Sequence, residues 1–231
     1  MPIAWLPIPA LVLVLLVLLR VETRPQRNLR AARLLRLLAT LLVLSVAALS
    51  FAQPIHLALY SSLIVIALLW SLIGDWLLSD ARDALRFGRG AMAFVVAHGF
   101  YIAALSYVQV ARGAPLNLNR EGMLAAAIGL LALVVYVYLR PRLGESHGVV
   151  AIYITVLSLM VHRAVSGIEV GASLLSQSVL AGAGAVLFYI SDLMLAINRF
   201  VFNDEGTANS AWVLSTYYCA QLFLALSASY L

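Results

Sequence analysis

Residues 55–79 read IHLALYSSLIVIALLWSLIGDWLLS, an apolar run of the length that a helix needs to cross a membrane, about 20 residues. The run contains one carboxylic acid, Asp75, close to its C-terminal end. Placing an ionised carboxylate in hydrocarbon costs roughly 3 kcal/mol or more. Asp75 therefore needs a hydrogen-bonding partner, a bound proton or a role in chemistry.

The composition extends this reading to the whole chain of 231 residues, of which 64% are hydrophobic and 11% are charged. A soluble domain cannot hide so much apolar surface, because much of the surface of any globule faces water. We expect an all-α polytopic membrane protein, an eight-transmembrane-helix bundle that forms one integral membrane domain over 1–231. The expected spans are 2–19, 32–52, 55–79, 90–111, 121–139, 147–165, 176–198 and 209–229.

The arginines predict how this bundle is oriented. The loops and flanks after the first, third, fifth and seventh spans carry twelve of the fifteen arginines, and the other loops carry only Arg112, Arg120 and Arg163. Positive charge concentrates on the cytoplasmic side of membrane proteins, so loops 20–31, 80–89, 140–146 and 199–208 are predicted to be cytoplasmic and both termini periplasmic. This distribution explains the net charge of +5 without a nucleic-acid partner. Arginine without lysine is typical of a GC-rich bacterial genome, so we expect the bacterial inner membrane.

A short internal echo suggests two parallel four-helix repeats, 1–115 and 116–231. "LIGDWLLSD" in the third span resembles "YISDLMLAI" in the seventh, and a span with polar aromatics follows each of them. Four spans separate the two copies, so both halves would insert with the same polarity. Parallel repeats in transporters place their binding site between the halves.

Polar groups from four spans are predicted to lie in one layer below the cytoplasmic face. Each residue alone has an ordinary explanation, such as an interfacial aromatic or a packed histidine. Two carboxylates at one depth are harder to explain in that way, because intramembrane acids are rare and mostly face cavities or pathways. The layer holds Asp75, His98, Asp192, Tyr217, Tyr218 and Gln221.

Two carboxylates and an imidazole are compatible with three chemistries. The first is acid–base catalysis, in which a dry site keeps one carboxyl neutral while the other stays ionised. The second is a carboxylate-rich metal site, but neither HExxH nor CxxC occurs in the chain, and we predict no metal. The third is proton- or ion-coupled transport by the same acids. A non-catalytic scaffold would leave the layer unexplained.

Four motifs follow one another along the chain: "GDWLL", "HGFY", "GAVLFYISDLMLAINRF" and "YYCAQ". This ordered set resembles the YhhN family of lysoplasmalogenase-like membrane proteins, and the likeness covers roughly 30–231. It implies an alkenyl ether hydrolase that cleaves the sn-1 vinyl ether of a lysoplasmalogen, without a cofactor. The products would be a fatty aldehyde and glycerophosphoethanolamine or glycerophosphocholine. Carried over by position, Asp75 and Asp192 would be the catalytic pair, with His98, Tyr101, Asn198, Tyr218 and Gln221 lining the site. Together with the polar layer, this predicts the catalytic residues Asp75, Asp192 and His98 and the substrate-binding residues Tyr101, Asn198, Arg199, Tyr217, Tyr218 and Gln221.

The implied reaction suits two acids. Hydrolysis of a vinyl ether begins with protonation of its β-carbon, which needs a neutral acid, and gives an oxocarbenium ion that a nearby anion stabilises. Catalytic carboxyl pairs of glycosidases lie within about 10 Å, and we expect the same of Asp75 and Asp192. The expected partners are membrane lipids and a lysophospholipid substrate, whose phosphate could meet Arg199 or Arg89. The alternative function is a proton-coupled transporter of a small solute or lipid.

Overall fold

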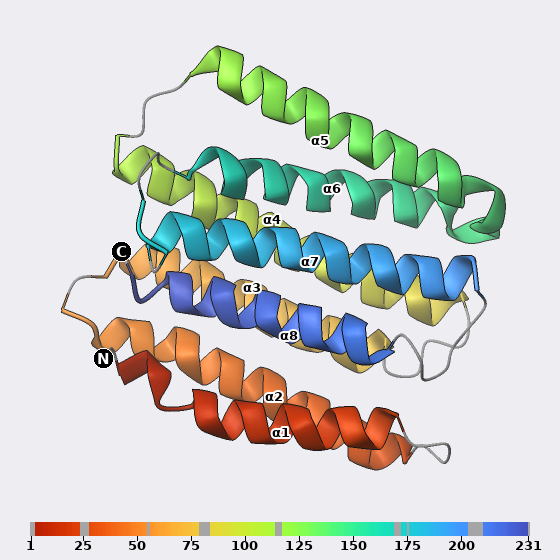
Figure 1. Ribbon diagram of the computed structural model, residues 1–231, viewed down its shortest axis with the longest axis horizontal. Coiled ribbons are helices and arrows are strands. Elements are labelled where there is room, and N and C mark those ends of the chain that lie inside the picture. The colour runs from red at the N-terminus through yellow and green to blue at the C-terminus, as the bar shows by residue number, and fades with distance from the viewer. Residues whose placement is uncertain are drawn as a thin grey trace.

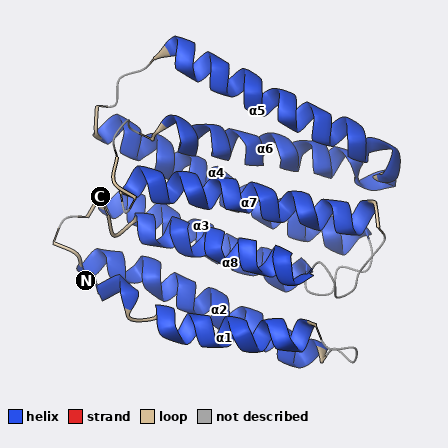
Figure 2. Ribbon diagram, viewed as in Figure 1, coloured by secondary structure: helices blue, strands red, loops and turns tan. Residues whose placement is uncertain are grey.

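The computed structural model describes residues 3–23, 28–54, 56–78, 84–113, 117–168, 172–174, 176–202 and 210–230. Every regular element in these ranges is a helix, and none is a strand (Figures 1 and 2). The α-helices are α1 (Ile8–Glu22), α2 (Leu29–Ala48), α3 (Ala58–Leu78), α4 (Ala84–Ala111), α5 (Leu118–Leu139), α6 (His147–Ser166), α7 (Gln177–Phe200) and α8 (Ser210–Ser227). Short 3₁₀ turns are η1 (Ile3–Trp5), η2 (Leu49–Ala52), η3 (Arg140–Arg142) and η4 (Gly144–Ser146).

The lengths of the helices suit a membrane. In the described part of the chain, 7 helices are long and apolar enough to span a bilayer, and a shorter apolar helix, Ala211–Ser227, forms most of α8. Figure 1 shows α8 running alongside the others through the middle of the bundle. The predicted all-α bundle of eight helices is confirmed, and the protein is an integral membrane protein.

Two helix starts differ from the expectation. The first span was expected from residue 2, and the apolar span does begin at Ile3 with η1, but its regular α-helix, α1, begins at Ile8, directly after Pro7 and with Pro9 in its first turn. Proline lacks the backbone donor that a helix interior needs and is favoured in the first turn, so the helix starts there. The fourth span was expected from residue 90, but α4 begins at Ala84, because a helix continues past the apolar core into polar sequence.

Both chain ends lie at one end of the bundle, and α1, α3, α5 and α7 run to the other end, where α2, α4, α6 and α8 begin (Figure 1). This is the arrangement expected if the connections with most arginines share one side of the membrane. Parts of three of those connections (residues 24–27, 79–83 and 203–209) lie outside the described residues. That this side is cytoplasmic stays a prediction from the arginine distribution.

The helix contacts support the proposal of two parallel repeats. The most extensive contacts are between α3 and α4 and between α7 and α8. The α1–α2 contact corresponds in the same way to α5–α6, the α2–α3 contact to α6–α7, and the α2–α8 contact to α4–α6. Most of the extensive contacts thus have a counterpart four helices later, although the α1–α8 and α3–α8 contacts have none of similar extent among the described residues. Such a pattern follows when two four-helix units assemble around a common axis.

Glycines allow the two closest helix pairs to approach. A Cβ atom on Gly74 of α3 would lie 2.5 Å from the Phe94 ring of α4, which is closer than real contacts allow. A Cβ on Gly184 of α7 would lie 3.0 Å from the carbonyl oxygen of Ala220 in α8. Small residues at such crossings stabilise membrane helices through close packing. Gly74 directly precedes Asp75, so this close approach also places Phe94 beside that acid's segment of α3.

Candidate active site

Asp75 is held by side chains from two other helices. Its Oδ2 accepts a hydrogen bond from Tyr217 of α8, with an oxygen–oxygen distance of 2.8 Å, and one from Thr40 of α2 at 3.2 Å. Thr40 and Tyr217 are buried, at 1% and 6% exposure, while Asp75 itself is partly exposed. The fixed donors set the orientation of the carboxyl group and leave part of it accessible.

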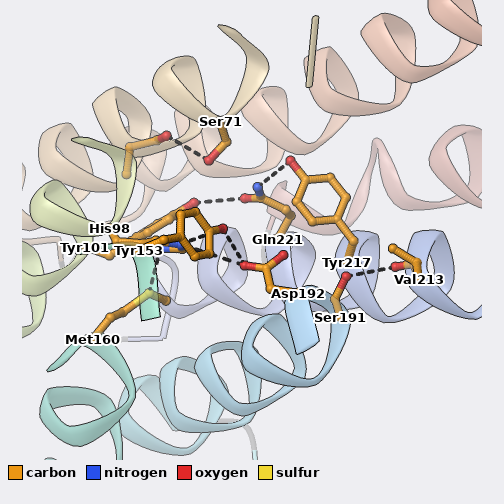
Figure 3. Close-up of polar contacts among 11 residues, drawn as sticks. Ser71, His98, Tyr101, Tyr153, Met160, Ser191, Asp192, Val213, Tyr217 and Gln221 are labelled. Atoms are coloured by element: carbon orange, nitrogen blue, oxygen red, sulfur yellow. Dashed lines mark hydrogen bonds and ion pairs between the residues drawn. The ribbon is translucent and has the colours of Figure 1, made fainter. Parts of the chain in front are cut away.

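A chain of buried hydrogen bonds continues behind Tyr217. Gln221, one turn further along α8, donates from Nε2 to the Tyr217 hydroxyl at 2.9 Å. Its Oε1 accepts from the Tyr101 hydroxyl of α4 at 2.8 Å (Figure 3). Gln221 and Tyr101 are both buried, at 1% and 0% exposure. We call Tyr101, Gln221 and Tyr217 the relay.

Asp192 has its own, different surroundings. Its Oδ2 accepts a short hydrogen bond of 2.5 Å from the hydroxyl of Tyr153 in α6. Nε2 of His98 lies 3.3 Å from that hydroxyl and 4.0 Å from Asp192 Oδ2, so Tyr153 stands between the imidazole and the acid (Figure 3). The other ring nitrogen of His98 faces the Met160 sulfur at 3.2 Å. His98 is fully buried, whereas the Asp192 side chain is 11% exposed.

Aromatic rings join the two acid clusters. The Phe188 ring contacts His98 with a centroid distance of 4.8 Å and Tyr217 with one of 5.4 Å. Phe94 lies 6.4 Å from the His98 ring and 6.0 Å from the Tyr217 ring. The charge of Asp75 also acts on Asp192. The two clusters therefore share one wall of rings, a surrounding with little water in which electrostatic interactions are strong.

The two clusters follow the repeat pattern. Each acid lies on the third helix of its half, Asp75 on α3 and Asp192 on α7. Each receives a hydroxyl from the second helix of the same half, Thr40 or Tyr153. Each also faces a ring from the last helix of the other half, which is Tyr217 for Asp75. For Asp192 that ring is His98. The site thus needs both halves.

The remaining predicted residues lie toward the arginine-rich end. The Tyr218 hydroxyl donates to the backbone oxygen of Arg36 at 3.2 Å, not to either acid. The Arg36 guanidinium pairs with the buried Glu22 at 2.7 Å. Arg199 lies at the end of α7 beside Asn198, with its guanidinium 4.4 Å from the centre of the Phe87 ring. Tyr218 therefore faces α2, and Asn198 and Arg199 lie at the end of α7, so these three residues are placed around the acid layer.

Sequence reasoning missed Tyr153 and Thr40, the hydroxyl partners of the two acids. Tyr153 lies less than two turns inside α6, and counting depth from His147 would have put it in the same layer as Asp192. Thr40 carried no such signal, because a threonine in an apolar helix most often bonds its own backbone. It does so here as well, to the oxygen of Arg36 at 3.1 Å.

The opposite end of the bundle holds a small cavity of about 10 Å³ between α4, α6 and α7, with Gln109, Arg112 and Gln177 in its lining. This volume is enough for roughly one water molecule, so the cavity does not compete with the acid layer as a lipid site. Among the described residues, no three or more His, Cys, Asp and Glu side chains gather as metal ligands would.

A family model matches most of the chain. The model of the YhhN family covers residues 31–228, which include both acids, the relay, Tyr153 and Thr40. The chain belongs to the YhhN family. The helix that contributes Glu22, α1, precedes the matched segment.

Curated proteins that are similar in sequence to this chain are named lysoplasmalogenases. Lysoplasmalogenase TMEM86A of Bos taurus is 36% identical over 167 residues, which cover 71% of this chain and 64% of that protein. The Homo sapiens TMEM86A is 34% identical over 166 residues, with the same coverage of 71% and 64%. A lysoplasmalogenase of Mycobacterium tuberculosis is 35% identical over 157 residues, 64% of this chain and 54% of that protein. The chain thus spans less than two thirds of these relatives' length, and no solved structure matches it.

Proposed function

We propose that this YhhN-family protein is a lysoplasmalogenase, which hydrolyses the sn-1 vinyl ether of a lysoplasmalogen. The observation that carries the proposal is the pair of acids, one from each half of the bundle, beside a shared wall of aromatic rings. The similarity to proteins named lysoplasmalogenase supports the same activity. The products are a fatty aldehyde and glycerophosphoethanolamine or glycerophosphocholine.

The chemistry divides between the two carboxyl groups. One carboxylic acid transfers its proton to the β-carbon of the vinyl ether, and the electrons of the double bond form the new C–H bond. The α-carbon and the ether oxygen then share the positive charge of an oxocarbenium ion, which the second carboxyl stabilises as an anion. A water molecule adds to the α-carbon and gives a proton to that anion. The hemiacetal then breaks at its C–O bond to glycerol: the second carboxyl returns its proton to the glycerol oxygen, and the first carboxylate takes the proton of the hemiacetal hydroxyl. This gives the glycerol alcohol and the aldehyde and restores both carboxyl groups.

The other groups support these two acids. His98 orients Asp192 through the Tyr153 hydroxyl, because the imidazole is too far from the carboxyl for a direct hydrogen bond. General acid catalysis by one of the two carboxyl groups contributes typically about 10²–10⁴-fold in rate. Among the predicted substrate-binding residues, Asn198 and Arg199 lie at the end of α7, where a phosphate head group would meet the protein.

The arginine distribution completes the proposal. With the arginine-rich connections in the cytoplasm, the acid layer opens toward the cytoplasmic leaflet of a bacterial inner membrane, and both termini are periplasmic. A lysolipid in that leaflet places its tail in hydrocarbon and its head group at the surface, which brings its vinyl ether to a depth of about one turn inside. Asp75 lies near the end of α3, at that depth.

The proposal is tested by aldehyde release from a lysoplasmalogen by purified protein in detergent. Asp75→Asn and Asp192→Asn should each abolish most release while the folded fraction is unchanged, because an amide keeps the shape but neither donates a carboxyl proton nor carries the charge. Glu145→Gln, at an exposed carboxyl of η4, is the matched control and should keep normal activity. A proton-coupled transporter, the alternative function, would release no aldehyde but would move substrate across sealed vesicles.

A further inference from the structure

The amide of Gln221 gives the relay a direction. An amide has an acceptor oxygen on one side and a donor nitrogen on the other. Here Oε1 accepts from Tyr101, and Nε2 donates to the oxygen of Tyr217. The one hydroxyl proton of Tyr217 then points to the remaining partner, Oδ2 of Asp75. Every hydrogen bond in the relay therefore runs toward Asp75, and Asp75 can only be an acceptor at that oxygen.

The surroundings of the two acids also favour an ionised Asp75 over an ionised Asp192. Asp75 accepts a hydrogen bond from the Tyr217 hydroxyl, and the Thr40 hydroxyl, 3.2 Å away, shares its one proton between Asp75 and the Arg36 backbone oxygen. The charge of Arg36 also acts on Asp75. Asp192 accepts one hydroxyl hydrogen bond, from Tyr153, and its nearest ring nitrogen belongs to a fully buried histidine. An ionised carboxyl is stabilised by each additional donor and by a nearby cation, whereas a carboxyl with fewer of them in a dry site is more stable with its proton.

We propose that Tyr101, Gln221 and Tyr217 form a positioning relay that keeps Asp75 as the anion of the pair and leaves Asp192 as the proton donor. This assignment deepens the proposed function and rests on it. It also changes the role predicted for Tyr101 and Gln221, which were expected to bind substrate. At 0% and 1% exposure they do not face an incoming lipid, and they act on the reaction through Asp75.

The assignment predicts which of two Gln221 variants has the lower kcat. Gln221→Met keeps the length of the side chain but removes both hydrogen bonds, so kcat should fall roughly 10- to 100-fold, as for one hydrogen bond to a charged group, with little change in KM. Gln221→Glu is closer in shape, yet the new carboxylate accepts from both tyrosines and draws the Tyr217 proton away from Asp75. We expect Gln221→Glu to be slower than Gln221→Met. Equal or higher activity of the glutamate variant would overturn the relay.

The chain offers matched controls for these variants. Gln177 is also buried and hydrogen-bonded to a tyrosine, Tyr60 at 2.9 Å, but lies at the other end of the bundle. Gln177→Met should therefore keep its kcat, as long as the thermal midpoint shows that it folds. Tyr60→Phe, at that same contact with Gln177, should likewise stay near normal, and Tyr217→Phe should lose kcat. An equal loss of kcat in Gln221→Met and Gln177→Met, or in Tyr217→Phe and Tyr60→Phe, would show a structural effect and contradict the relay.

A measurement independent of turnover tests the protonation states. The infrared carbonyl band of a protonated carboxyl shifts in D₂O, which identifies it in the purified full-length protein. We expect this band to vanish in Asp192→Asn and to remain in Asp75→Asn. If it vanishes in Asp75→Asn instead, or is missing from the unaltered protein, the assignment is wrong even if aldehyde is released. If no aldehyde is released but the band behaves as expected, the proposed function fails and the assignment of protons stands.

Discussion

Replacing Tyr153 by phenylalanine isolates the least expected contact in the site. The change removes one oxygen atom and leaves the ring, which contacts His98 with a centroid distance of 5.5 Å. The lost hydroxyl donates to Asp192 at 2.5 Å and also lies 3.3 Å from His98. Among the described residues, Asp192 then keeps no side-chain hydrogen-bond donor, because the His98 imidazole at 4.0 Å is beyond direct reach.

The size of the effect follows from the strength of that bond. Asp192 becomes charged as it gives up its proton in the transition state. A hydrogen bond to a charged group contributes about 1.5–3 kcal/mol, which corresponds to a rate loss of roughly 10- to 150-fold. Initial rates of aldehyde release measure the loss. Tyr138→Phe, on an exposed ring of α5 at the same end of the bundle, is the matched control. Near-normal activity of a folded Tyr153→Phe protein would refute the link between His98 and Asp192.

Three further predictions concern stability and topology. Gly74→Ala places a methyl group 2.5 Å from the Phe94 ring, so overpacking should lower the free energy of unfolding by about 1–3 kcal/mol. The thermal midpoint in detergent measures this loss, and an unchanged midpoint would contradict the close α3–α4 contact. Glu22→Gln breaks the 2.7 Å ion pair with Arg36, whose side chain is only 19% exposed and would lose the carboxylate of Glu22. The free energy of unfolding should fall by up to about 3 kcal/mol, and an unchanged value would show that the pair is dispensable. A reporter that is active only in the periplasm should be active when fused at Leu231, and activity of a cytoplasmic reporter there would reverse the orientation.

The arrangement of the helices could be predicted from sequence because it depends on few features. Apolar runs of span length and turn residues between them are visible in the chain, and the described helices α2, α3, α5, α6 and α7 begin or end within a few residues of the expected spans. The depth of Asp75 and Asp192 followed from the same ends. Helix starts were less predictable, since α4 extends into polar sequence that hydropathy alone excludes.

The details of the site depend on helix rotation, which the sequence does not specify. Tyr217 and Tyr218 are adjacent and differ by about 100° around α8, and only Tyr217 faces Asp75. Sequence gave both the same expected role. The direction of the Gln221 amide depends on Tyr101, 120 positions earlier in the chain, so it could be read only from the folded bundle.

Aldehyde release by the purified protein and its two aspartate variants tests the central claim most directly. The account predicts that the unaltered protein converts a lysoplasmalogen to fatty aldehyde, and that Asp75→Asn and Asp192→Asn each lose at least about 10²-fold in rate while remaining folded and able to bind the lysolipid. Near-normal release by either folded variant would contradict the account, because both carboxyl groups are needed for the reaction.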